Sequence, residues 1–486
     1  MWGEHQRRPS VKREANLPRA DTPSKEAAAI VLKYAAGTLT VHGIDSGHEI
    51  AVRFPGQVKW DARSHCFRCA GHLYALIVKW LVRSGLPFDD QACSYERLAL
   101  EYDSGGRSSR PYQREALAAW LKEGGRGVVV LPTGAGKSLM ALLAIADRQR
   151  SALIVAPTLD LVRQWYDLLK AAFGIEVGLL GGGEYEIRPI TVSTYDSAHL
   201  HVERWGNRFG LVVFDEVHHL PSPSFQLAAR LCIAPYRLGL TATPERTDGA
   251  ESCIEELVGP IVCRRDIVEM TGQFLADYET VRLTVQLTEA EREQYESARE
   301  TYLAFTRRHG IKFNGPTGWS DFIKRAASSR EGRRALDAYR VQKGIAIAAS
   351  AKIAKLEELL IKHNRDRCLV FTLDNRTVYD ISRRFLIPAI THQTKVKERS
   401  EHLKLFSQGV YGAVVTSRVL NEGVDVPEAS VAIIVSGTGS VREHVQRLGR
   451  ILRPRDGKQA VLYELVTGQT AETGTSERRR DHLAYR

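Results

Sequence analysis

Short, wholly apolar runs alternate with helical patterns along most of the chain, and this alternation constrains the fold more than any other feature of the sequence. The runs at 128–131, 152–155 and 211–214 are apolar throughout, as strands buried on both faces of a sheet tend to be. Such strands separated by helices form parallel sheets wound with crossover helices. The alternation breaks near Leu287 and resumes at 368–371. The sequence therefore predicts an α/β fold with two parallel-sheet domains and an insertion at their join.

The segments outside this alternation indicate the domain boundaries. Residues 1–26 are rich in Pro, Arg and Lys without periodicity, which predicts a flexible tail. The stretch 30–95 has short apolar runs followed by a helical pattern, which is typical of a small α+β domain, and residues 103–109 have the composition of a linker. We accordingly expect an N-terminal domain at 27–103, a first α/β domain at 104–270, a second at 271–470 with its insertion at 289–345, and a C-terminal tail at 471–486.

The chain has 486 residues and a formal net charge of +11, with 43% hydrophobic and 26% charged residues. This composition is that of a folded globular protein and excludes the disordered and fibrous classes, while the positive charge favours polyanionic partners. No stretch approaches the roughly eighteen apolar residues that a bilayer-spanning helix needs, and the N-terminus leads into no apolar signal core. We therefore expect a cytoplasmic protein without a membrane partner.

Seven cysteines in a chain of this length do not make a disulfide scaffold, and a reducing compartment is the simpler interpretation. One cluster has the residue types of a zinc site, and its members are His65, Cys66, Cys69 and His72. His65 and Cys66 are adjacent, which makes shared tetrahedral ligation awkward. Buried thiols and a surface histidine are the alternative.

The insertion is basic as well as helical, since residues 299–343 hold eleven Lys or Arg against four Asp or Glu. The aromatic residues interleaved with these charges are Tyr302, Phe305, Phe313 and Trp319. A charge run of this kind is commonly a solvated helix face. With interleaved aromatics it is also typical of a surface that binds nucleic acid, so both interpretations stay open.

A glycine-rich segment between the apolar run at 128–131 and the helical pattern after it has the sequence of a phosphate-binding loop. Glycines let the backbone curl so that its N–H groups face phosphates, and the helix N-terminus adds its dipole. Lys137 would bind the β- and γ-phosphates of ATP, and the Ser138 hydroxyl would ligate Mg²⁺. Leu131 stands where the strict consensus has glycine, and a mere glycine-rich turn is the alternative. The candidate ATP-binding residues of this loop are Thr133, Gly134, Ala135, Gly136, Lys137 and Ser138.

Two adjacent carboxylates, Asp215 and Glu216, follow directly after the apolar run at 211–214. An isolated pair of this kind is commonly a piece of surface. At the end of a buried strand and downstream of a phosphate loop, one carboxylate would hold Mg²⁺ and its neighbour would orient and polarise the attacking water. We expect Asp215 to ligate the metal and Glu216 to activate the water, so that both are catalytic together with Lys137.

Two further segments complete this domain. Gln113, ahead of the phosphate loop, would read the edge of the adenine, with a simple helix start as the alternative. Thr241 and Thr243 follow the fourth strand, where they would couple hydrolysis to movement, and we place His218 with them as a coupling residue.

With these segments assembled, the sequence resembles superfamily 2 helicases, and within them the XPB group, particularly its archaeal members. The segments that occur in the family's order are the phosphate loop, Asp-Glu-Val-His at 215–218, Thr-Ala-Thr at 241–243 and the arginine-rich segment at 446–454. More local matches lie at 193–198, 385–392 and 421–427. The likeness runs from about residue 30 to residue 467.

The resemblance implies two RecA-like domains with a nucleotide cleft between them, a thumb-like insertion and an N-terminal damage-recognition domain. It also implies coupling of ATP hydrolysis to DNA opening with 3′–5′ polarity in nucleotide excision repair, and a DNA nuclease as a partner of archaeal members. One departure concerns strand separation, because this chain has Arg246, Thr247 and Asp248 where the family has an Arg-Glu-Asp loop. The missing central carboxylate leaves a double-strand translocase without true unwinding as the alternative activity.

The second α/β domain would complete the catalyst from across the cleft. Arg450 and Arg453 are three residues apart on a predicted helix, so both would reach the transferring phosphoryl group and stabilise its charge. By family position, Gln446 would couple the two domains, and Gly423 and Asp425 would help to bind the nucleotide. The nucleic-acid contacts expected by motif position are Thr158, Arg163, Ser193, Thr194, Arg246, Asp248 and Thr372.

The leading expectation is an ATP-dependent DNA helicase that uses ATP and Mg²⁺ and acts on single-stranded, forked or damaged duplex DNA. RNA as the substrate is a further alternative. A non-catalytic clamp that recruits a nuclease to damaged DNA is another, and it has no chemical need for Lys137, Glu216 and Arg450 together.

Overall fold

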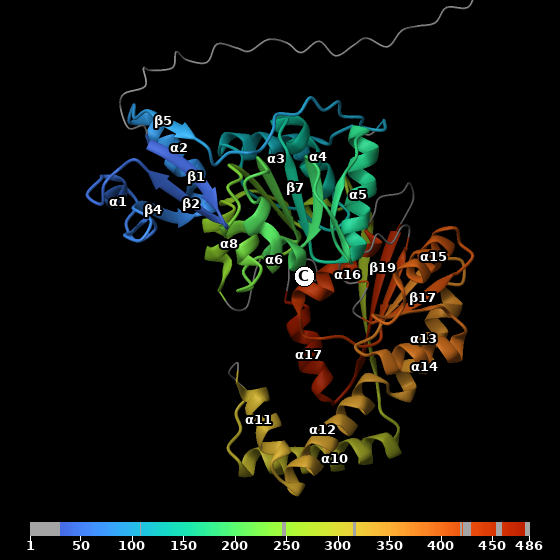
Figure 1. The fold of residues 1–486 in the computed structure, drawn as a ribbon. Coiled ribbons are helices and arrows are strands. Elements are labelled where there is room, and N and C mark those ends of the chain that lie inside the picture. The colour runs from blue at the N-terminus through green and yellow to red at the C-terminus, as the bar shows by residue number, and fades with distance from the viewer. Residues whose placement is uncertain are drawn as a thin grey trace, which may run out of the picture.

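The structure is a computed structural model that describes residues 30–106, 108–244, 249–313, 317–417, 420, 429–452 and 459–481. Figure 1 shows a small N-terminal domain in blue, a first α/β lobe in green, a second α/β lobe in orange and red, and a helical arm in yellow. Two sheets of largely parallel strands with covering helices confirm the predicted fold class. The expected flexible tail at 1–26 lies outside the described residues. Within the described ranges, no helix combines the length and the apolar character needed to cross a bilayer.

The N-terminal domain is built on a five-stranded sheet in the order β3-β4-β2-β1-β5, which is antiparallel except where β1 pairs with β5. Inward residues of the strands and of helix α2 share one core, for example Leu32, Val41 and Ile77. Its elements are β1 (Ile30–Ala35), β2 (Thr38–His42), α1 (Ile50–Arg53), β3 (Lys59–Asp61), β4 (Cys66–Ala70), the 3₁₀ turn η1 (Gly71–Leu73), α2 (Tyr74–Arg83) and β5 (Phe88–Asp90).

The first lobe has an eight-stranded sheet in the order β13-β6-β12-β11-β7-β10-β8-β9, in which every described pairing is parallel except that of β8 with β9. Its central strands are buried on both faces, which explains their wholly apolar sequences. The strands are β6 (Arg126–Val130), β7 (Ala152–Ala156), β8 (Gly178–Gly181), β9 (Glu184–Glu186), β10 (Ile190–Thr194), β11 (Leu211–Asp215), β12 (Tyr236–Thr241) and β13 (Ile261–Arg264). The helices are α3 (Pro111–Lys122), α4 (Lys137–Arg148), α5 (Leu159–Phe173), α6 (Tyr195–Trp205), η2 (Val217–His219), α7 (Gln226–Arg230), α8 (Glu251–Leu257) and α9 (Ile267–Met270).

The second lobe has a six-stranded parallel sheet in the order β14-β19-β18-β15-β17-β16. The strands are β14 (Asp277–Val285), β15 (Cys368–Phe371), β16 (Ala389–Ile390), β17 (Ala413–Thr416), β18 (Val431–Ile434) and β19 (Gln459–Thr467). The helices are α13 (Ser350–Lys362), α14 (Asn375–Phe385), α15 (Val396–Ser407), α16 (Val441–Ile451) and α17 (Ala471–Arg479). Residues 471–479, which the sequence pattern assigns to a C-terminal tail, therefore form a packed helix.

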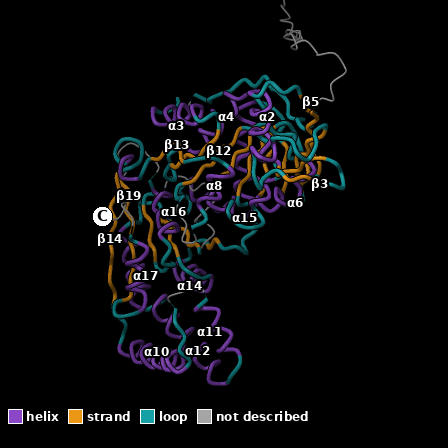
Figure 2. The backbone as a smooth tube through the Cα atoms, turned by 90° about the vertical axis from the view of Figure 1, so that its left-hand side faces the viewer, coloured by secondary structure: helices purple, strands orange, loops and turns teal. Residues whose placement is uncertain are grey.

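The helical arm is inserted between β14 and α13 of the second lobe, and we call it the thumb. It consists of α10 (Glu289–Arg308), α11 (Gly318–Ala327) and α12 (Arg330–Ile347). Phe305 and Phe322 lie in its small core, whereas Phe313 and Trp319 are 42% and 45% exposed. Figures 1 and 2 both show the three helices together at the end of the molecule remote from the N-terminal domain.

Candidate nucleotide-hydrolysis site

A cavity of about 1120 Å³ lies where the two lobes meet. It is lined by the phosphate loop and the two adjacent carboxylates of the first lobe and by Arg450 of the second. The carboxyl ends of β6 and β11 lead to these residues, and ligands bind at that edge in doubly wound sheets. The structure thus brings Lys137, Asp215, Glu216 and Arg450 to one cavity, while Arg453 lies outside the described residues.

The phosphate loop connects β6 to α4. Gly134 and Gly136 have φ angles of +89° and +77°, in the left-handed region that favours glycine. Helix α4 begins at Lys137, so its positive dipole end lies at the cavity. Lys137 Nζ donates to the carbonyl oxygen of Leu131 at 3.4 Å. This loop has the backbone form and the position that phosphate binding requires.

The side chain of Gln113 is hydrogen-bonded to the backbone of the phosphate loop. Its side chain is 2% exposed, and its Nε2 donates to the carbonyl oxygens of Ala135 at 3.1 Å and Gly136 at 3.4 Å. Its Oε1 accepts from the backbone N–H of Arg110 at 2.9 Å. Because both N–H donors are engaged, only one lone pair of the carbonyl oxygen is left for an adenine. The geometry therefore gives Gln113 a structural task in addition to the base contact expected from sequence.

Asp215 is buried, and the neighbouring Glu216 side chain is 13% exposed. Asp215 Oδ2 accepts from Trp165 Nε1 at 2.9 Å, and Oδ1 accepts from the Glu216 N–H at 3.0 Å. Burial and then the charge of Glu216 raise the pKa of Asp215 to about 6, and Lys137 opposes this shift. Glu216 Oε2 is buried without a hydrogen-bond partner and lies 3.4 Å from His218 Nδ1.

These side chains fit a magnesium ion and a triphosphate. The two adjacent carboxylates repel each other, one buried and one largely so, and a divalent cation that takes oxygen ligands would relieve that repulsion. Asp215 and the Ser138 hydroxyl are the residues that would hold the ion. Lys137 and the loop amides would hold the phosphates.

Three of the four residues expected to have a coupling role, His218, Thr241 and Thr243, form one hydrogen-bonded group. His218 Nδ1 lies 3.1 Å from Thr241 Oγ1, and the Thr243 N–H donates to that same hydroxyl oxygen at 3.2 Å. All three residues are buried. Since His218 is also next to Glu216, two contacts connect the Glu216 carboxylate to the end of β12.

Helix α16 packs against the phosphate loop, and this packing places Arg450 at the cavity. A Cβ added to Gly449 would lie 2.5 Å from Thr133 Cβ, so only glycine permits this approach. The helix is capped by Ser440, and Gln446 is buried within it at 2% exposure. Gly423 and Asp425 lie outside the described residues.

Two of the residues expected to contact nucleic acid cap helices of the first lobe. Thr158 Oγ1 accepts from the third residue of α5 at 3.3 Å, and Thr194 Oγ1 accepts from the third residue of α6 at 3.0 Å. Their hydroxyls are thus engaged within the lobe. Phosphate contacts from these positions would use the helix N-termini.

The other expected contacts differ in accessibility. Arg163 is exposed on α5. Ser193 and Thr372 are fully buried, and their hydroxyls donate to the carbonyl oxygens of Thr194 and Asp374. Arg246 and Asp248, with Thr247 between them, lie outside the described residues.

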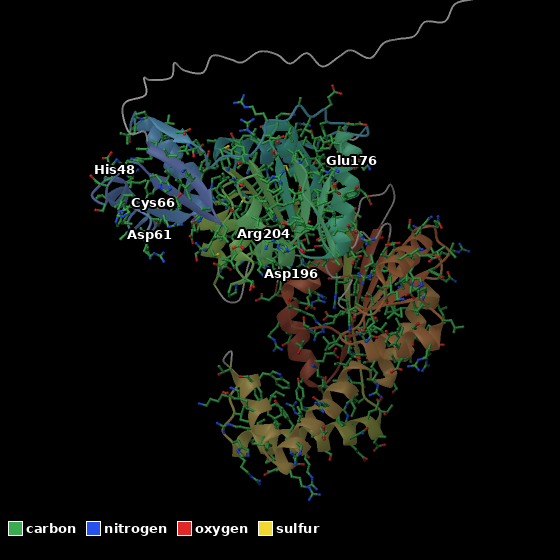
Figure 3. All side chains as sticks on the ribbon, viewed as in Figure 1. His48, Asp61, Cys66, Glu176, Asp196 and Arg204 are labelled. Atoms are coloured by element: carbon green, nitrogen blue, oxygen red, sulfur yellow. The ribbon has the colours of Figure 1, made fainter. Side chains whose placement is uncertain are left out.

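The residues weighed as a zinc site do not converge. Cys66 and Cys69 are buried in β4 of the N-terminal domain, where Figure 3 labels Cys66. His72 instead faces Glu256 of the first lobe, with 3.7 Å between Nε2 and Oε1. Among the described residues, no three His, Cys, Asp or Glu side chains are grouped to hold a metal.

Three family models match the chain in the order of its domains. Residues 32–92 match the xeroderma pigmentosum group B helicase damage recognition domain, 107–246 the type III restriction enzyme res subunit, and 351–455 the helicase conserved C-terminal domain. The chain is 41% identical over 427 residues to the DNA 3′-5′ translocase XPB2 of Sulfurisphaera tokodaii, which covers 88% of this chain and 96% of that protein. The chain belongs to the XPB family of helicases. The resemblance found in the sequence is thereby confirmed.

Other XPB relatives are more distant. The DNA 3′-5′ helicase XPB of Kineococcus radiotolerans is 33% identical, covering 83% of this chain and 68% of its own length. That of Mycobacterium tuberculosis is 32% identical, covering 83% and 69%. Among solved structures, the Hef helicase domain of Pyrococcus furiosus covers 77% of this chain and 98% of its own, with a TM-score of 0.50 and 19% identity. That likeness shows the fold alone.

Sequence reasoning about this XPB-family protein missed one residue of the cavity and one ion pair between the lobes. Trp165 in α5 holds Asp215 at the end of β11, and no motif marks it. Asp160 of the first lobe and Arg399 of the second form an ion pair that is 15% and 10% exposed. These two residues are 239 positions apart, so no local pattern connects them.

Proposed function

We propose that this protein is a motor that couples ATP hydrolysis to 3′–5′ movement along DNA and opens DNA in nucleotide excision repair. The observation that carries the proposal is the composition of the cavity, because Lys137 and Glu216 of the first lobe line the same space as Arg450 of the second. A nucleotide bound there would contact both lobes. Its hydrolysis and release would then change the relative position of the lobes.

Each residue of the cavity has a defined task in this chemistry. Lys137 would bind the transferring phosphate, and Arg450 would stabilise the charge that develops on it, an effect on the order of 10³ to 10⁵ in rate in comparable enzymes. Glu216, whose Oε2 is buried without a hydrogen-bond partner, would orient the attacking water and polarise it. Mg²⁺, held by Ser138 and Asp215, would supply neutralising charge at the phosphate oxygens.

The thumb supports nucleic acid as the substrate. Its residues 299–343 are strongly basic, and Phe313 and Trp319 expose aromatic faces there. Cations that track phosphates and aromatic rings that stack on bases are the combination that single strands need, whatever their sequence. The names of the relatives favour DNA over RNA and the 3′–5′ direction for this chain as well.

A double-strand translocase without true unwinding is the second candidate. Thr247 replaces the family's central carboxylate in the strand-separation loop, and the S. tokodaii relative is named a translocase. A non-catalytic clamp that recruits a nuclease is less consistent with the assembled cavity. A DNA nuclease partner stays a prediction by family likeness, and a cytoplasmic location stays a prediction from the sequence pattern.

The first experiment measures ATP turnover with and without single-stranded DNA. We expect turnover that rises with DNA, and we expect Lys137→Ala and Glu216→Gln each to abolish it because they remove phosphate binding and water activation. Lys122→Ala, which changes an exposed lysine at the end of α3, is the matched control and should behave as the unaltered protein. Near-normal turnover in either site variant would refute the site assignment.

A second experiment separates unwinding from translocation. Displacement of a strand from a forked duplex would support a helicase. Displacement of a third strand from a triplex, with the forked duplex left intact, would support the translocase and end the unwinding proposal. RNA in place of DNA, assayed in parallel, tests the substrate class.

A further inference from the structure

Helix α17 lies between the thumb and helix α16, and both views show it there (Figures 1 and 2). Its residues are hydrophilic, yet Glu472, Ser476 and Arg479 are buried. A helix with a buried polar face is held by specific hydrogen bonds and ion pairs instead of by apolar packing alone. Those contacts reach in two directions, to the base of the thumb and to the helix that carries Arg450.

The N-terminal end of α17 is bonded to the thumb. The N–H of Ala471, the first residue of α17, donates to the hydroxyl oxygen of Tyr295 in α10 at 2.9 Å. Just before α17, Thr467 Oγ1 donates to the carbonyl oxygen of Ala346 in the last turn of α12 at 2.8 Å. Tyr295 and Ala346 also share a small apolar core at the thumb base. Both long thumb helices are therefore attached where α17 begins.

A buried ion pair joins the same end of α17 to the strand that precedes α16. Lys352 Nζ donates to both carboxylate oxygens of Glu472, at 2.7 and 2.6 Å, and to the carbonyl oxygen of Val435 at 2.6 Å. Val435 follows directly after β18 and opens the segment that leads into α16. Lys352 is fully buried, so this contact cannot be exchanged for water at low cost.

The C-terminal half of α17 is bonded to strand β19, which carries Glu464, and lies beside α16. Arg479 Nε lies 2.6 Å from Glu464 Oε1, and both side chains are 1% exposed. A Cβ added to Gly437, in the turn before α16, would lie 2.8 Å from Nη1 of Arg479 and 2.8 Å from Nη1 of Arg447. The guanidinium groups of Arg447 in α16 and Arg479 in α17 therefore pack against the same glycine, so a shift of α17 would change the packing at the turn that leads into α16.

From these contacts we propose that the thumb controls ATP turnover through α17. Tyr295, Lys352 and Glu472 are positioning residues: they carry a displacement of the thumb to α16 and thereby to Arg450 in the cavity. Nucleic acid bound at the thumb positions Arg450 to contact the transferring phosphoryl group. The rate of ATP turnover therefore depends on nucleic acid. This inference rests on the proposed function, because it assumes a DNA-stimulated ATPase.

The test is Tyr295→Phe, which removes one hydroxyl and keeps the ring in the thumb core. We expect basal turnover, the KM for ATP and the affinity for single-stranded DNA to stay unchanged. The DNA-stimulated kcat should fall by about two- to tenfold, the range that one hydrogen bond contributes. Tyr463→Phe is the matched control, because its hydroxyl bonds Lys362 and His363 on the face of β19 opposite to Glu464. It should keep full stimulation.

A second variant, Glu472→Gln, removes the charge that Lys352 faces while it keeps the shape of the side chain. We expect a larger loss of DNA-stimulated kcat than in Tyr295→Phe. The double variant Tyr295→Phe, Glu472→Gln should have the same DNA-stimulated kcat as Glu472→Gln alone, because the two residues act in series. Amide exchange at Ala471 reports whether the contact has opened in the folded variant.

Three results would overturn the proposal. The first is full stimulation in folded Tyr295→Phe. The second is a fall in DNA affinity that accounts for the lost stimulation, which would make Tyr295 part of the binding surface. The third is an equal fall in basal and stimulated turnover, which would mean that α17 only supports α16. If the proposed function itself is wrong, ATP turnover of the unaltered protein will not rise with DNA, which distinguishes that outcome from the three above.

Discussion

The two accessory parts of this molecule are attached to their lobes by different physical means. The N-terminal domain meets the first lobe mainly through uncharged, closely packed groups, beside one ionisable pair, His72 and Glu256. Tyr34 donates its hydroxyl to the carbonyl oxygens of Val202 at 3.0 Å and Leu231 at 2.8 Å. A Cβ at Gly71 would lie 2.7 Å from the Leu231 carbonyl oxygen, and Ile233 of the first lobe belongs to the core of the N-terminal domain.

The thumb is attached beside a network of buried full charges. Lys352 and Glu472 form one ion pair, and Arg479 and Glu464 form another. Burial lowers the pKa of Lys352, and Glu472 opposes that shift. Buried ion pairs contribute little net stability because desolvation offsets their attraction. We infer that these pairs supply a unique orientation of α17 against α16.

The difference between the two attachments indicates which accessory domain can transmit a displacement to the cavity. A close-packed contact, largely between uncharged groups, holds the N-terminal domain in one place on the first lobe. The charged network lies between the attachment of the thumb and the segment that leads into α16, the helix that carries Arg450. Changes at the first contact should therefore affect stability alone, and changes at the second should affect both stability and catalysis.

The largest effect is expected from Arg479→Met. It removes the closest cation of the buried Glu464 carboxylate and leaves Arg480, whose Nη1 lies 3.3 Å from Oε2, so the free energy of unfolding should fall by about 3 kcal/mol, the lower end of the range for a broken buried ion pair. Chemical denaturation of the full chain, followed by a probe in the second lobe, measures the loss. Arg478→Met, at the exposed neighbouring position, should stay within about 0.5 kcal/mol. Equal stability of the two variants would show that the buried network is not needed.

An intermediate effect is expected when the pH falls, through His72 at the N-terminal contact. Burial, followed by the charges of Arg237 and Arg230, lowers the pKa of His72 to about 4 from 6.5, with Glu256 opposing. The folded state thus favours neutral histidine, and this stability is lost as the pH falls from about 6.5 toward 4. Between pH 7.5 and pH 5 the loss should be roughly 2 kcal/mol.

The measurement is the unfolding of the N-terminal domain in the full chain against pH, for the unaltered protein and for His72→Phe. The phenylalanine variant cannot take up a proton there, so it should lack this part of the pH dependence. If both proteins lose the same stability at pH 5, His72 is not the group that titrates.

The smallest effect is expected from Tyr34→Phe. It removes one hydroxyl that serves two carbonyl oxygens, and the free energy of unfolding should fall by about 1 kcal/mol. Basal and DNA-stimulated ATP turnover should both stay unchanged, unlike those of Tyr295→Phe. A loss of stimulation in Tyr34→Phe as well would remove the contrast between the two attachments.

Local sequence determined much of the candidate site. A phosphate loop needs only a strand, a few glycines and a helix start in succession, and Asp215 and Glu216 need only the end of one strand. The alternation of apolar runs and helical patterns likewise predicted both sheets. These features depend on neighbours along the chain, which is why they can be read from it.

Helix α17 shows where such patterns fail. Its inward face carries Glu472, Ser476 and Arg479, so no apolar stripe distinguishes it from a solvated tail. The sequence indicated an adenine contact for Gln113 but not its hydrogen bonds to the phosphate loop. Those bonds depend on how α3 packs beside the loop.

The sequence by itself therefore determined the family, the fold class and the chemical types gathered for ATP hydrolysis. Only the tertiary structure decided which lobe surfaces meet, for example the contact of Gly449 with Thr133. It also decided that charged residues more than a hundred positions apart in the chain are buried together. Short-range order follows from backbone preference and hydrophobic period. A buried ion pair is stable only when the whole fold has placed both partners and excluded water from them.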